Sequence, residues 1–208
     1  MARGRTPGLG YRLAKRLLDI VGALAGLGVT AILFIPLAVC IRLDSRGSII
    51  FRQTRVTRAN RPFRFYKFRT MVVDQALTQN ELDRIQEVRD PTFKRPDDPR
   101  VTRVGSLLRR YSLDELPQFW CVLRGDMSLV GPRPPLMREV TKYQPHEFQR
   151  LQVRQGMTGL WQVRGRSRLS FDDMIELDLQ YVRNRSLGMD LGILLRTVPV
   201  VLRGDGAF

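Results

Sequence analysis

The chain has 208 residues, 43% of them hydrophobic, and a formal net charge of +15. This composition supports a packed core and excludes wholesale disorder, while the charge predicts a polyanionic partner such as nucleic acid, an anionic membrane or a phosphorylated substrate. Two cysteines and one histidine exclude a disulfide scaffold and a histidine-rich metal site, favour a reducing cytoplasmic setting, and leave carboxylates and arginines as the groups available for chemistry.

An apolar run without a charged side chain covers residues 20–41. As a helix it would reach roughly 33 Å, which is enough to cross a bilayer core. Both flanks are strongly basic, and basic flanks stay on the cytoplasmic side. Two interpretations remain open: a re-entrant helix that breaks near Pro36 and returns to the same face, or one spanning helix kinked by that proline.

Two short strands are predicted at 48–51 and 63–68, separated by a turn at 59–62. Their residues favour β-structure, and the turn contains an asparagine and a proline. The following polar stretch is mostly loop, with a surface helix expected at 81–88.

Further along, the segment 104–120 is predicted to be helical in parts, with a bend or a new helix start at Pro117. A rigid proline-rich turn follows at 131–135, then a helix over 137–152 and a turn-rich stretch at 156–165. Proline and glycine fix these boundaries because each disrupts the continuation of a helix.

Helical spacing recurs at 171–181, with Ser170 as its expected N-cap. The apolar stretch 191–202 either lies in a membrane interface or caps the core. The predicted fold class is therefore α+β and mainly helical: a re-entrant or kinked N-terminal membrane helix, a small β element, and interfacial amphipathic helices around a compact catalytic domain. The expected division is residues 1–45 for the membrane-associated part and 46–208 for the catalytic part.

Adjacent acidic pairs occur at 97–98, 114–115 and 172–173. Only the pair at 114–115 is flanked by leucines, Leu113 and Leu116, which predicts a partly buried setting. Two explanations remain open: structural ion pairs, or a phosphate site in which one carboxylate attacks phosphorus and the other holds magnesium. Arginine suits phosphate through its two parallel donors. The arginines near this pair in the sequence are Arg100, Arg103, Arg109, Arg110, Arg124 and Arg133.

Other candidates carry weaker signals. Lys67 and Arg69 fall on one face of a predicted strand and form either an anion anchor or ordinary basic surface. Arg133 lies between prolines, which suits a preorganised anion contact or an interfacial wedge. Trp161 and Gln162 lie in a glycine-rich turn and are candidates to contact a base or sugar, or to fill the core.

In order, these stretches resemble the bacterial monotopic phosphoglycosyl transferase superfamily, which includes undecaprenyl-phosphate sugar phosphotransferases. The resemblance covers nearly the whole chain with compatible spacing. The matching motifs are Lys15-Arg16-x-x-Asp19, Arg42-Leu43-Asp44-Ser45, Phe51-Arg52-Gln53, Tyr66-Lys67-Phe68-Arg69-Thr70-Met71, Ser112-Leu113-Asp114-Glu115-Leu116-Pro117-Gln118, Gly125-Asp126-Met127-Ser128-Leu129-Val130-Gly131-Pro132-Arg133-Pro134 and Gly159-Leu160-Trp161-Gln162-Val163-x-Gly165-Arg166.

The resemblance implies that Asp114 is a nucleophile that attacks the β-phosphate of a UDP-sugar, forms an aspartyl-phosphosugar and releases UMP. Polyprenyl phosphate, usually undecaprenyl phosphate, then accepts the phosphosugar. Glu115 is similar to the family's magnesium-associated glutamate, so Mg²⁺ is the expected cofactor, held by Glu115 and Asp114. The positions that the resemblance assigns to substrate binding are Lys67, Arg69, Arg109, Asp126, Arg133, Gln162 and Arg166.

The same resemblance implies a location on the cytoplasmic face of a bacterial inner membrane, contact with phospholipids, a homodimer as in some members, and no nucleic-acid partner. The product would enter exopolysaccharide or O-antigen assembly, with glucose or galactose as the favoured sugar. One departure concerns the membrane helix, because Ala31-Ile32 stands where the family breaks its helix at Ser-Pro. Larger members carry an additional N-terminal region, so this chain is expected to be a compact form or a truncation.

Two other hypotheses come from different classes. A membrane-tethered nucleic-acid-binding protein would explain the arginine-rich stretch 52–69, although the sequence contains no recognisable helix-turn-helix, RRM or zinc module. A non-catalytic membrane scaffold would explain the apolar ends. The first hypothesis predicts that Asp114→Asn is neutral or improves affinity for nucleic acid, and the second predicts that it leaves the function intact.

Overall fold

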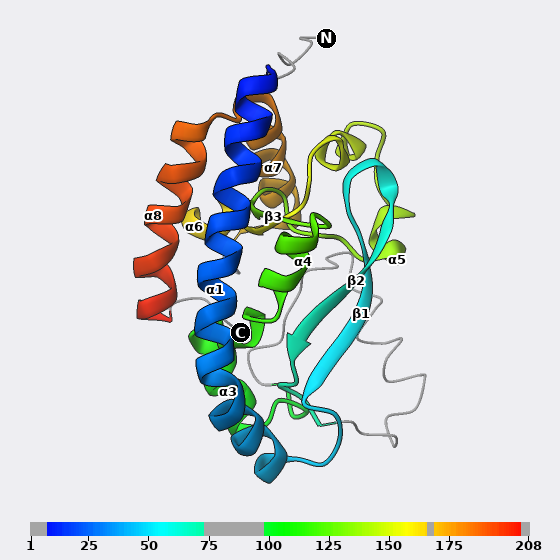
Figure 1. Ribbon diagram of the computed structural model, residues 1–208. Coiled ribbons are helices and arrows are strands. Elements are labelled where there is room, and N and C mark those ends of the chain that lie inside the picture. The colour runs from blue at the N-terminus through cyan, green and yellow to red at the C-terminus, as the bar shows by residue number, and fades with distance from the viewer. Residues whose placement is uncertain (1–7, 73–97, 166–168, 205–208) are drawn as a thin grey trace.

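A computed structural model describes residues 8–72, 98–165 and 169–204 (Figure 1). It confirms a mainly helical chain with little β-structure and one long apolar N-terminal helix. The helices are α1 (Leu9–Asp44), α3 (Arg103–Arg110), α4 (Gln118–Arg124), α5 (Met137–Val140), α6 (Leu160–Arg164), α7 (Phe171–Asn184) and α8 (Leu187–Arg203), with 3₁₀ turns η1 (Arg58–Asn60), η2 (Leu113–Glu115) and η3 (Glu147–Gln152). The strands are β1 (Ile50–Val56), β2 (Pro62–Phe68), β3 (Ser128–Val130) and β4 (Gly156–Thr158).

Strands β1 and β2 form an antiparallel hairpin in which Ile50 pairs with Phe68 and Val56 with Pro62. This confirms the two predicted strands and the turn between them, although β1 continues well past the predicted 48–51. In the turn, Ala59 and Asn60 have φ values of 57° and 60°, a left-handed conformation that asparagine tolerates better than most residues.

A second, parallel pair of strands, β3 and β4, was not predicted. Each has three residues, which is too short for an alternating pattern to be recognised. The pairing requires glycine, because a Cβ on Gly156 would lie 2.1 Å from the main-chain nitrogen of Gly131. This pair holds the start of the proline-rich turn 131–135 against β4.

The helix expected over 137–152 is wrong as one element. The chain forms α5, a turn and then η3, because Pro145 has no N–H to donate and disfavours helical geometry at the residue before it. The expected bend near Pro117 is confirmed by the succession of α3, η2 and α4. The helix at 171–181 is α7, and Ser170 Oγ caps it by accepting from the main-chain N–H of Asp173 at 3.2 Å. The surface helix expected at 81–88 lies outside the described residues.

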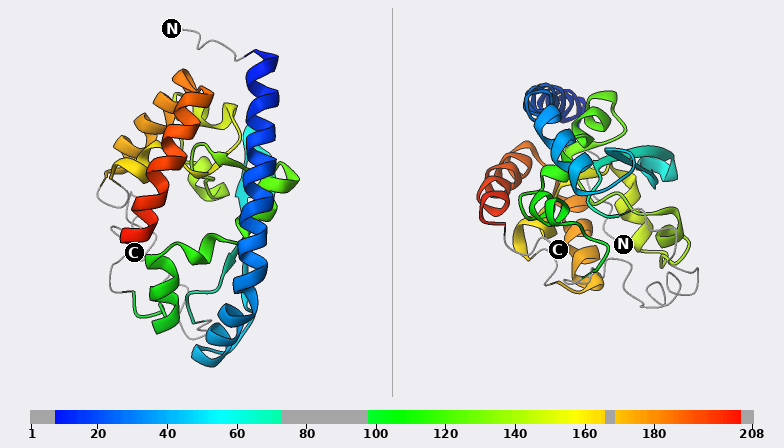
Figure 2. Two further views of the ribbon diagram at one scale, coloured as in Figure 1. Left: turned by 60° about the vertical axis from the view of Figure 1, so that its left-hand side comes forward. Right: turned by 90° about the horizontal axis from the view of Figure 1, so that it is seen from below.

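Helix α1 runs along the whole molecule beside α8 and α4 (Figures 1 and 2). It is continuous through Ala31-Ile32 and through Pro36. The last turns incline away from the axis of the rest (Figure 2), as expected for a helix with an internal proline.

Both ends of α1 are tied to the same domain. Near its start, Arg16 donates to the carbonyls of Val122 and Leu123 at 2.8 and 2.7 Å. At its end, the Asp44 carboxylate accepts from the main-chain N–H of Val104 at 3.0 Å. One stripe of the helix is buried against the domain, comprising Lys15, Asp19, Ala23, Gly26, Thr30 and Ile41.

The opposite stripe of α1 is apolar and exposed. By length and composition, α1 is a helix that could cross a membrane, but one of its faces is covered by protein. The exposed members are Leu9, Leu13, Leu17, Val21, Leu24, Val29, Ile32, Phe34, Ile35, Val39 and Leu43. Helix α8 adds a second exposed stripe at helical spacing, formed by Leu191, Leu195, Val198 and Leu202.

Two glycines of α1 test this packing. A Cβ on Gly26 would lie 2.5 Å from the ring of Phe119, whereas Gly28 has nothing within 4 Å. We expect Gly26→Ala to lower the free energy of unfolding by about 1–3 kcal/mol through overpacking. Gly28→Ala should leave it unchanged or raise it by up to about 1 kcal/mol, because alanine favours the helix. Thermal unfolding in detergent measures both, and equal effects would show that this face of α1 does not pack on α4.

Candidate active site

The acidic pair Asp114-Glu115 lies on η2, one short turn between α3 and α4. Ser112, directly before it, has a left-handed backbone with φ 54° and ψ 23°, a conformation that non-glycine residues rarely adopt outside constrained sites. Leu113 and Leu116 pack against a buried cluster below. The residue Asp114 is therefore 5% exposed, which confirms the predicted partly buried setting.

Lys67 of β2 bridges the two carboxylates. Its Nζ lies 3.1 Å from Asp114 Oδ2 and 2.9 Å from Glu115 Oε1. Burial alone would lower the pKa of Lys67, but the negative charges of Asp114 and Glu115 outweigh it and raise the pKa above its ordinary value. The ammonium thus stays charged and fixes the orientation of the Asp114 carboxylate through one of its two oxygens.

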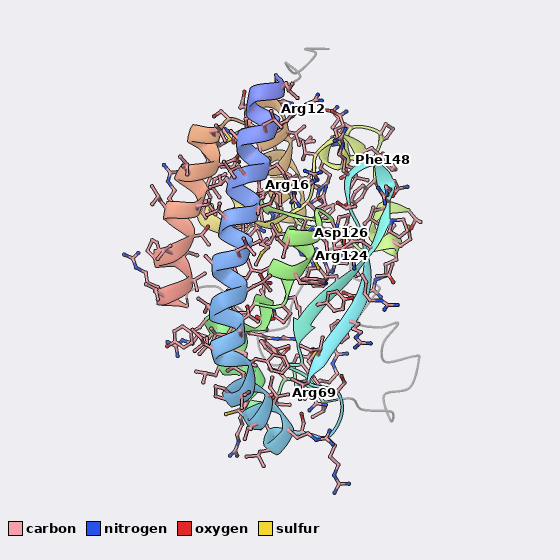
Figure 3. All side chains as sticks on the ribbon, viewed as in Figure 1. Arg12, Arg16, Arg69, Arg124, Asp126 and Phe148 are labelled. Carbon is pink, nitrogen blue, oxygen red and sulfur yellow. The ribbon has the colours of Figure 1, made fainter. Side chains whose placement is uncertain are left out.

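Arg69 does not join Lys67 at the acidic pair. Strand β2 ends at Phe68, so the side chain of Arg69 leaves the face on which Lys67 lies. Its guanidinium instead donates to the carbonyls of Ile41, Ser45 and Arg46 at 3.2, 2.6 and 2.7 Å, and Figure 3 shows it beside the last turns of α1. These three side-chain hydrogen bonds thus fix the end of α1 and the residues just after it; the contact of Arg69 with substrate stays a prediction.

Arg109 approaches Asp114 from α3. Its Nε donates to Thr70 Oγ1 at 3.0 Å. Burial lowers the pKa of Arg109, and the charge of Asp114 opposes that effect. Asp114 therefore lies between cations from two different elements, β2 and α3.

A second buried cation, Arg55 of β1, was missed as a site residue and treated only as basic flank. It lies across the hairpin from Phe63, on the same face as Phe65 and Lys67. Its Cζ is 4.6 Å from the centre of the Phe65 ring, and Lys67 Nζ is 5.9 Å from the same centre. The strand register identifies Arg55 as a site residue, because it places Arg55 and Gln53 on the same face of the hairpin as Lys67.

The surroundings of Arg55 are strongly positive. Burial and then the charge of Arg133 lower the pKa of Arg55 to about 9, opposed by Glu139 and Glu115. Two neighbouring guanidinium groups and the ammonium of Lys67 make this side of the site favourable for an anion carrying more than one charge.

The remaining predicted residues lie in varied positions. Arg133 Nη1 is 3.6 Å from Glu139 Oε2, within the positive region just described. Asp126 pairs with Arg124 at 3.3 Å beyond the end of α4 (Figure 3). Gln162 of α6 buries its Oε1 without a hydrogen-bond partner, and Trp161 does the same with Nε1. Arg166 lies outside the described residues. Substrate contacts of these residues stay predictions.

The acidic pair also bears on the expected magnesium ion. Among residues 8–72, 98–165 and 169–204, no cluster of three or more His, Cys, Asp or Glu side chains occurs. Magnesium in phosphoryl-transfer sites is commonly held by one or two carboxylates, completed by water and by substrate phosphate. Asp114 and Glu115 fit such a donor set, but only together with a phosphorylated substrate.

Comparison with known proteins gives a consistent result. The bacterial sugar transferase family matches residues 10–204. A galactosyl transferase from Streptococcus agalactiae is 47% identical over 95% of this chain and 44% of its own length. An undecaprenyl-phosphate galactose phosphotransferase from Salmonella typhimurium is 41% identical over 95% of this chain and 42% of its own length. An exopolysaccharide production protein from Rhizobium meliloti is 38% identical over 94% of this chain and 88% of its own length. The chain thus spans under half of the first two relatives and most of the third.

The Lys67 bridge can be tested through stability. Lys67→Met leaves two adjacent carboxylates without their shared cation. We expect a loss of about 2 kcal/mol in the free energy of unfolding at about pH 8. Denaturant unfolding of the variant and the wild type at this pH measures the difference.

The sign for the wild type follows from the raised pKa of Lys67. Its contribution to stability is fully present below the ordinary lysine value and is lost only as pH rises through the raised value, so it is fully present at about pH 8. Arg183→Met, which removes an exposed pair with Glu176 on α7, serves as the control. A Lys67→Met loss no larger than that of Arg183→Met would contradict the bridge.

Proposed function

Because the chain belongs to the bacterial sugar transferase family, we propose that it transfers a sugar-1-phosphate from a UDP-sugar to a polyprenyl phosphate. The observation that carries this proposal is the Asp114 carboxylate, buried and held at one oxygen by Lys67. The printed name of the Salmonella relative, undecaprenyl-phosphate galactose phosphotransferase, supports the choice of donor and acceptor class. The residues of this chain supply a nucleophile and neighbouring cations for the two phosphates.

In the first step, an oxygen of Asp114 attacks the β-phosphorus of the UDP-sugar. A bond forms between this oxygen and phosphorus, the bond from phosphorus to the bridging oxygen of UMP breaks, and UMP leaves with that electron pair. No proton has to be removed from the nucleophile, because a carboxylate attacks in its ionised form. The cations Lys67, Arg109 and Arg133 stabilise the charge on the transferring group and on UMP.

In the second step, a phosphate oxygen of the polyprenyl phosphate attacks the same phosphorus. The acyl-phosphate bond breaks, the carboxylate of Asp114 is restored, and a polyprenyl diphosphate-sugar is released. The low exposure of Asp114 supports this order, since exclusion of water protects an acyl phosphate from hydrolysis between the two steps.

We further propose that Glu115, with Asp114, holds one Mg²⁺ together with the substrate diphosphate. Such an ion would neutralise charge on the phosphates during transfer. Glu115 suits this role because its side chain is 35% exposed and therefore accessible, in contrast to the 7% of the Asp114 side chain. Within the chain, the ammonium of Lys67 pairs with both carboxylates and offsets part of their charge.

The enzyme is proposed to act on the cytoplasmic face of a bacterial inner membrane, with the exposed stripes of α1 and α8 in lipid. Both ends of α1 contact the same domain through Arg16 and Asp44, which supports a path that enters and leaves on one face. The basic flanks of α1 favour the cytoplasmic side. Phospholipids and the acceptor lipid are then reached from the same surface.

The nucleophile is tested with a UDP-sugar in the absence of lipid acceptor. We expect about one UMP released per protein and a phosphohexose adduct on the peptide that contains Asp114, found by mass spectrometry. Asp114→Asn should show neither, because an amide oxygen is a poor nucleophile towards phosphorus. Asp172→Asn, in the exposed acidic pair at the start of α7, is the matched control and should react like the wild type. A wild-type level of transfer by Asp114→Asn would overturn the mechanism.

The lipid-facing stripe is tested by vesicle co-sedimentation. Leu195→Asp and Leu202→Asp place charges on the exposed stripe of α8, and each should weaken binding to anionic vesicles by roughly tenfold or more. Phe148→Asp replaces an exposed aromatic residue on the side of the molecule away from α8 (Figure 3) and should have little effect. Equal effects of all three variants would count against α8 as a membrane-contacting helix.

A further inference from the structure

The proline-rich turn that carries Arg133 is held largely through its carbonyl groups. Prolines 132, 134 and 135 have no N–H, so the main chain can be fixed there mainly as a hydrogen-bond acceptor. The four consecutive carbonyls of residues 132–135 each accept one hydrogen bond. The donors are the main-chain N–H of Gly156 to Pro132 at 2.7 Å, Arg150 Nη2 to Arg133 at 3.4 Å, Arg55 Nη1 to Pro134 at 2.6 Å and the main-chain N–H of Val56 to Pro135 at 3.0 Å.

Two of these four donors are buried guanidinium groups. Arg55 is 8% exposed and Arg150 is 5% exposed, so neither is free to enclose a substrate. Arg55 also donates to Gln53 Oε1 through Nε and Nη2, which commits most of its planar fork. The carbonyls of Arg133 and Pro134 are thus held from two sides of the fold, by η3 and by β1.

Arg150 is itself fixed by a buried network. Its Nη2 pairs with Asp178 Oδ2 of α7, and its Nη1 donates to the Tyr143 hydroxyl at 2.8 Å. Burial alone would lower the pKa of Arg150, but the charge of Asp178 outweighs this effect and raises it. One guanidinium therefore joins three acceptors from three segments, a geometry that the single ammonium of lysine cannot reproduce.

A gain in folding stability alone does not explain why this ion pair is buried. A buried ion pair is often no more stabilising than apolar side chains of similar volume, because removing two charges from water costs as much as their attraction returns. The third acceptor of Arg150, the carbonyl of Arg133, suggests what the network does. The network holds the main chain of Arg133 in place. The position of that main chain then limits the region that the Arg133 guanidinium can reach.

We propose that Arg150 and Asp178 are positioning residues for Arg133: they hold its main chain so that its guanidinium stays beside Arg55 and faces a nucleoside diphosphate group. This inference rests on the proposed function only for the identity of the ligand. Neither residue touches the substrate. Arg55 holds the next carbonyl and serves the same purpose from the hairpin.

The test uses the double variant Arg150→Met with Asp178→Leu, which replaces the ion pair by apolar side chains and leaves no unpaired buried charge. Its thermal unfolding is compared with the wild type first, so that the measurement is made on folded protein. Affinity for UDP is then measured by calorimetry in the wild type, the double variant, Arg133→Ala and the combined triple variant. Glu176→Gln, on the exposed surface of α7, is the control.

We expect the double variant to bind UDP roughly 10- to 100-fold more weakly, because a small misplacement of a binding group has effects of this size. Arg133→Ala should weaken binding by a similar factor. The triple variant should be little worse than either, since both changes remove the same contact. In turnover, the loss should fall on KM for the UDP-sugar more than on kcat.

The inference would be overturned if the loss of UDP affinity in the triple variant equalled the product of the losses in the double variant and in Arg133→Ala. Such a result would show that Arg150 and Asp178 act independently of Arg133. Unchanged UDP affinity in a folded double variant would overturn it as well. The proposed function fails separately, if the wild type binds UDP but forms no phosphohexose adduct; the binding cycle still tests the inference in that case. A wild type that does not bind UDP at all would contradict both.

Discussion

The site depends on one electrostatic arrangement, in which the ammonium of Lys67 lies between the carboxylates of Asp114 and Glu115. Without this cation, two adjacent acids on a single 3₁₀ turn would repel each other. With it, that repulsion is offset, and Asp114 is held at one oxygen. The β1–β2 hairpin is therefore a functional element as well as a structural one, because it carries both Lys67 and Arg55.

The rest of the fold brings these groups together from segments that are distant in sequence. The end of α1 is fixed by Arg69, its start by Arg16, and between them a stripe of small residues lets the helix pack closely on the domain. The opposite stripe is left exposed. A single helix thus forms part of the hydrophobic core on one side and presents apolar side chains on the other, which is the property expected of a protein that draws a substrate from lipid.

Sequence reasoning found the acidic pair because leucines on both sides of it predicted burial, and the family resemblance assigned each carboxylate its proposed role. It could not predict that Lys67 and Arg69 have different partners, because this difference depends on β2 ending at Phe68. It missed Arg55 because only the strand register shows which basic residues of β1 share a face with Lys67. Pro145 explains the split of the predicted helix at 137–152 and was visible in the sequence, whereas strands of three residues such as β3 leave no readable pattern.

The central claim is that transfer proceeds through a phosphosugar bound to Asp114. It is tested most directly by isotope exchange between labelled UMP and unlabelled UDP-sugar without any lipid acceptor. A covalent intermediate predicts that the label enters the UDP-sugar at a rate that depends on protein, because the first step is then reversible on its own. No exchange, in a preparation that transfers the sugar phosphate once polyprenyl phosphate is added, would contradict the intermediate and would indicate direct transfer between the two substrates.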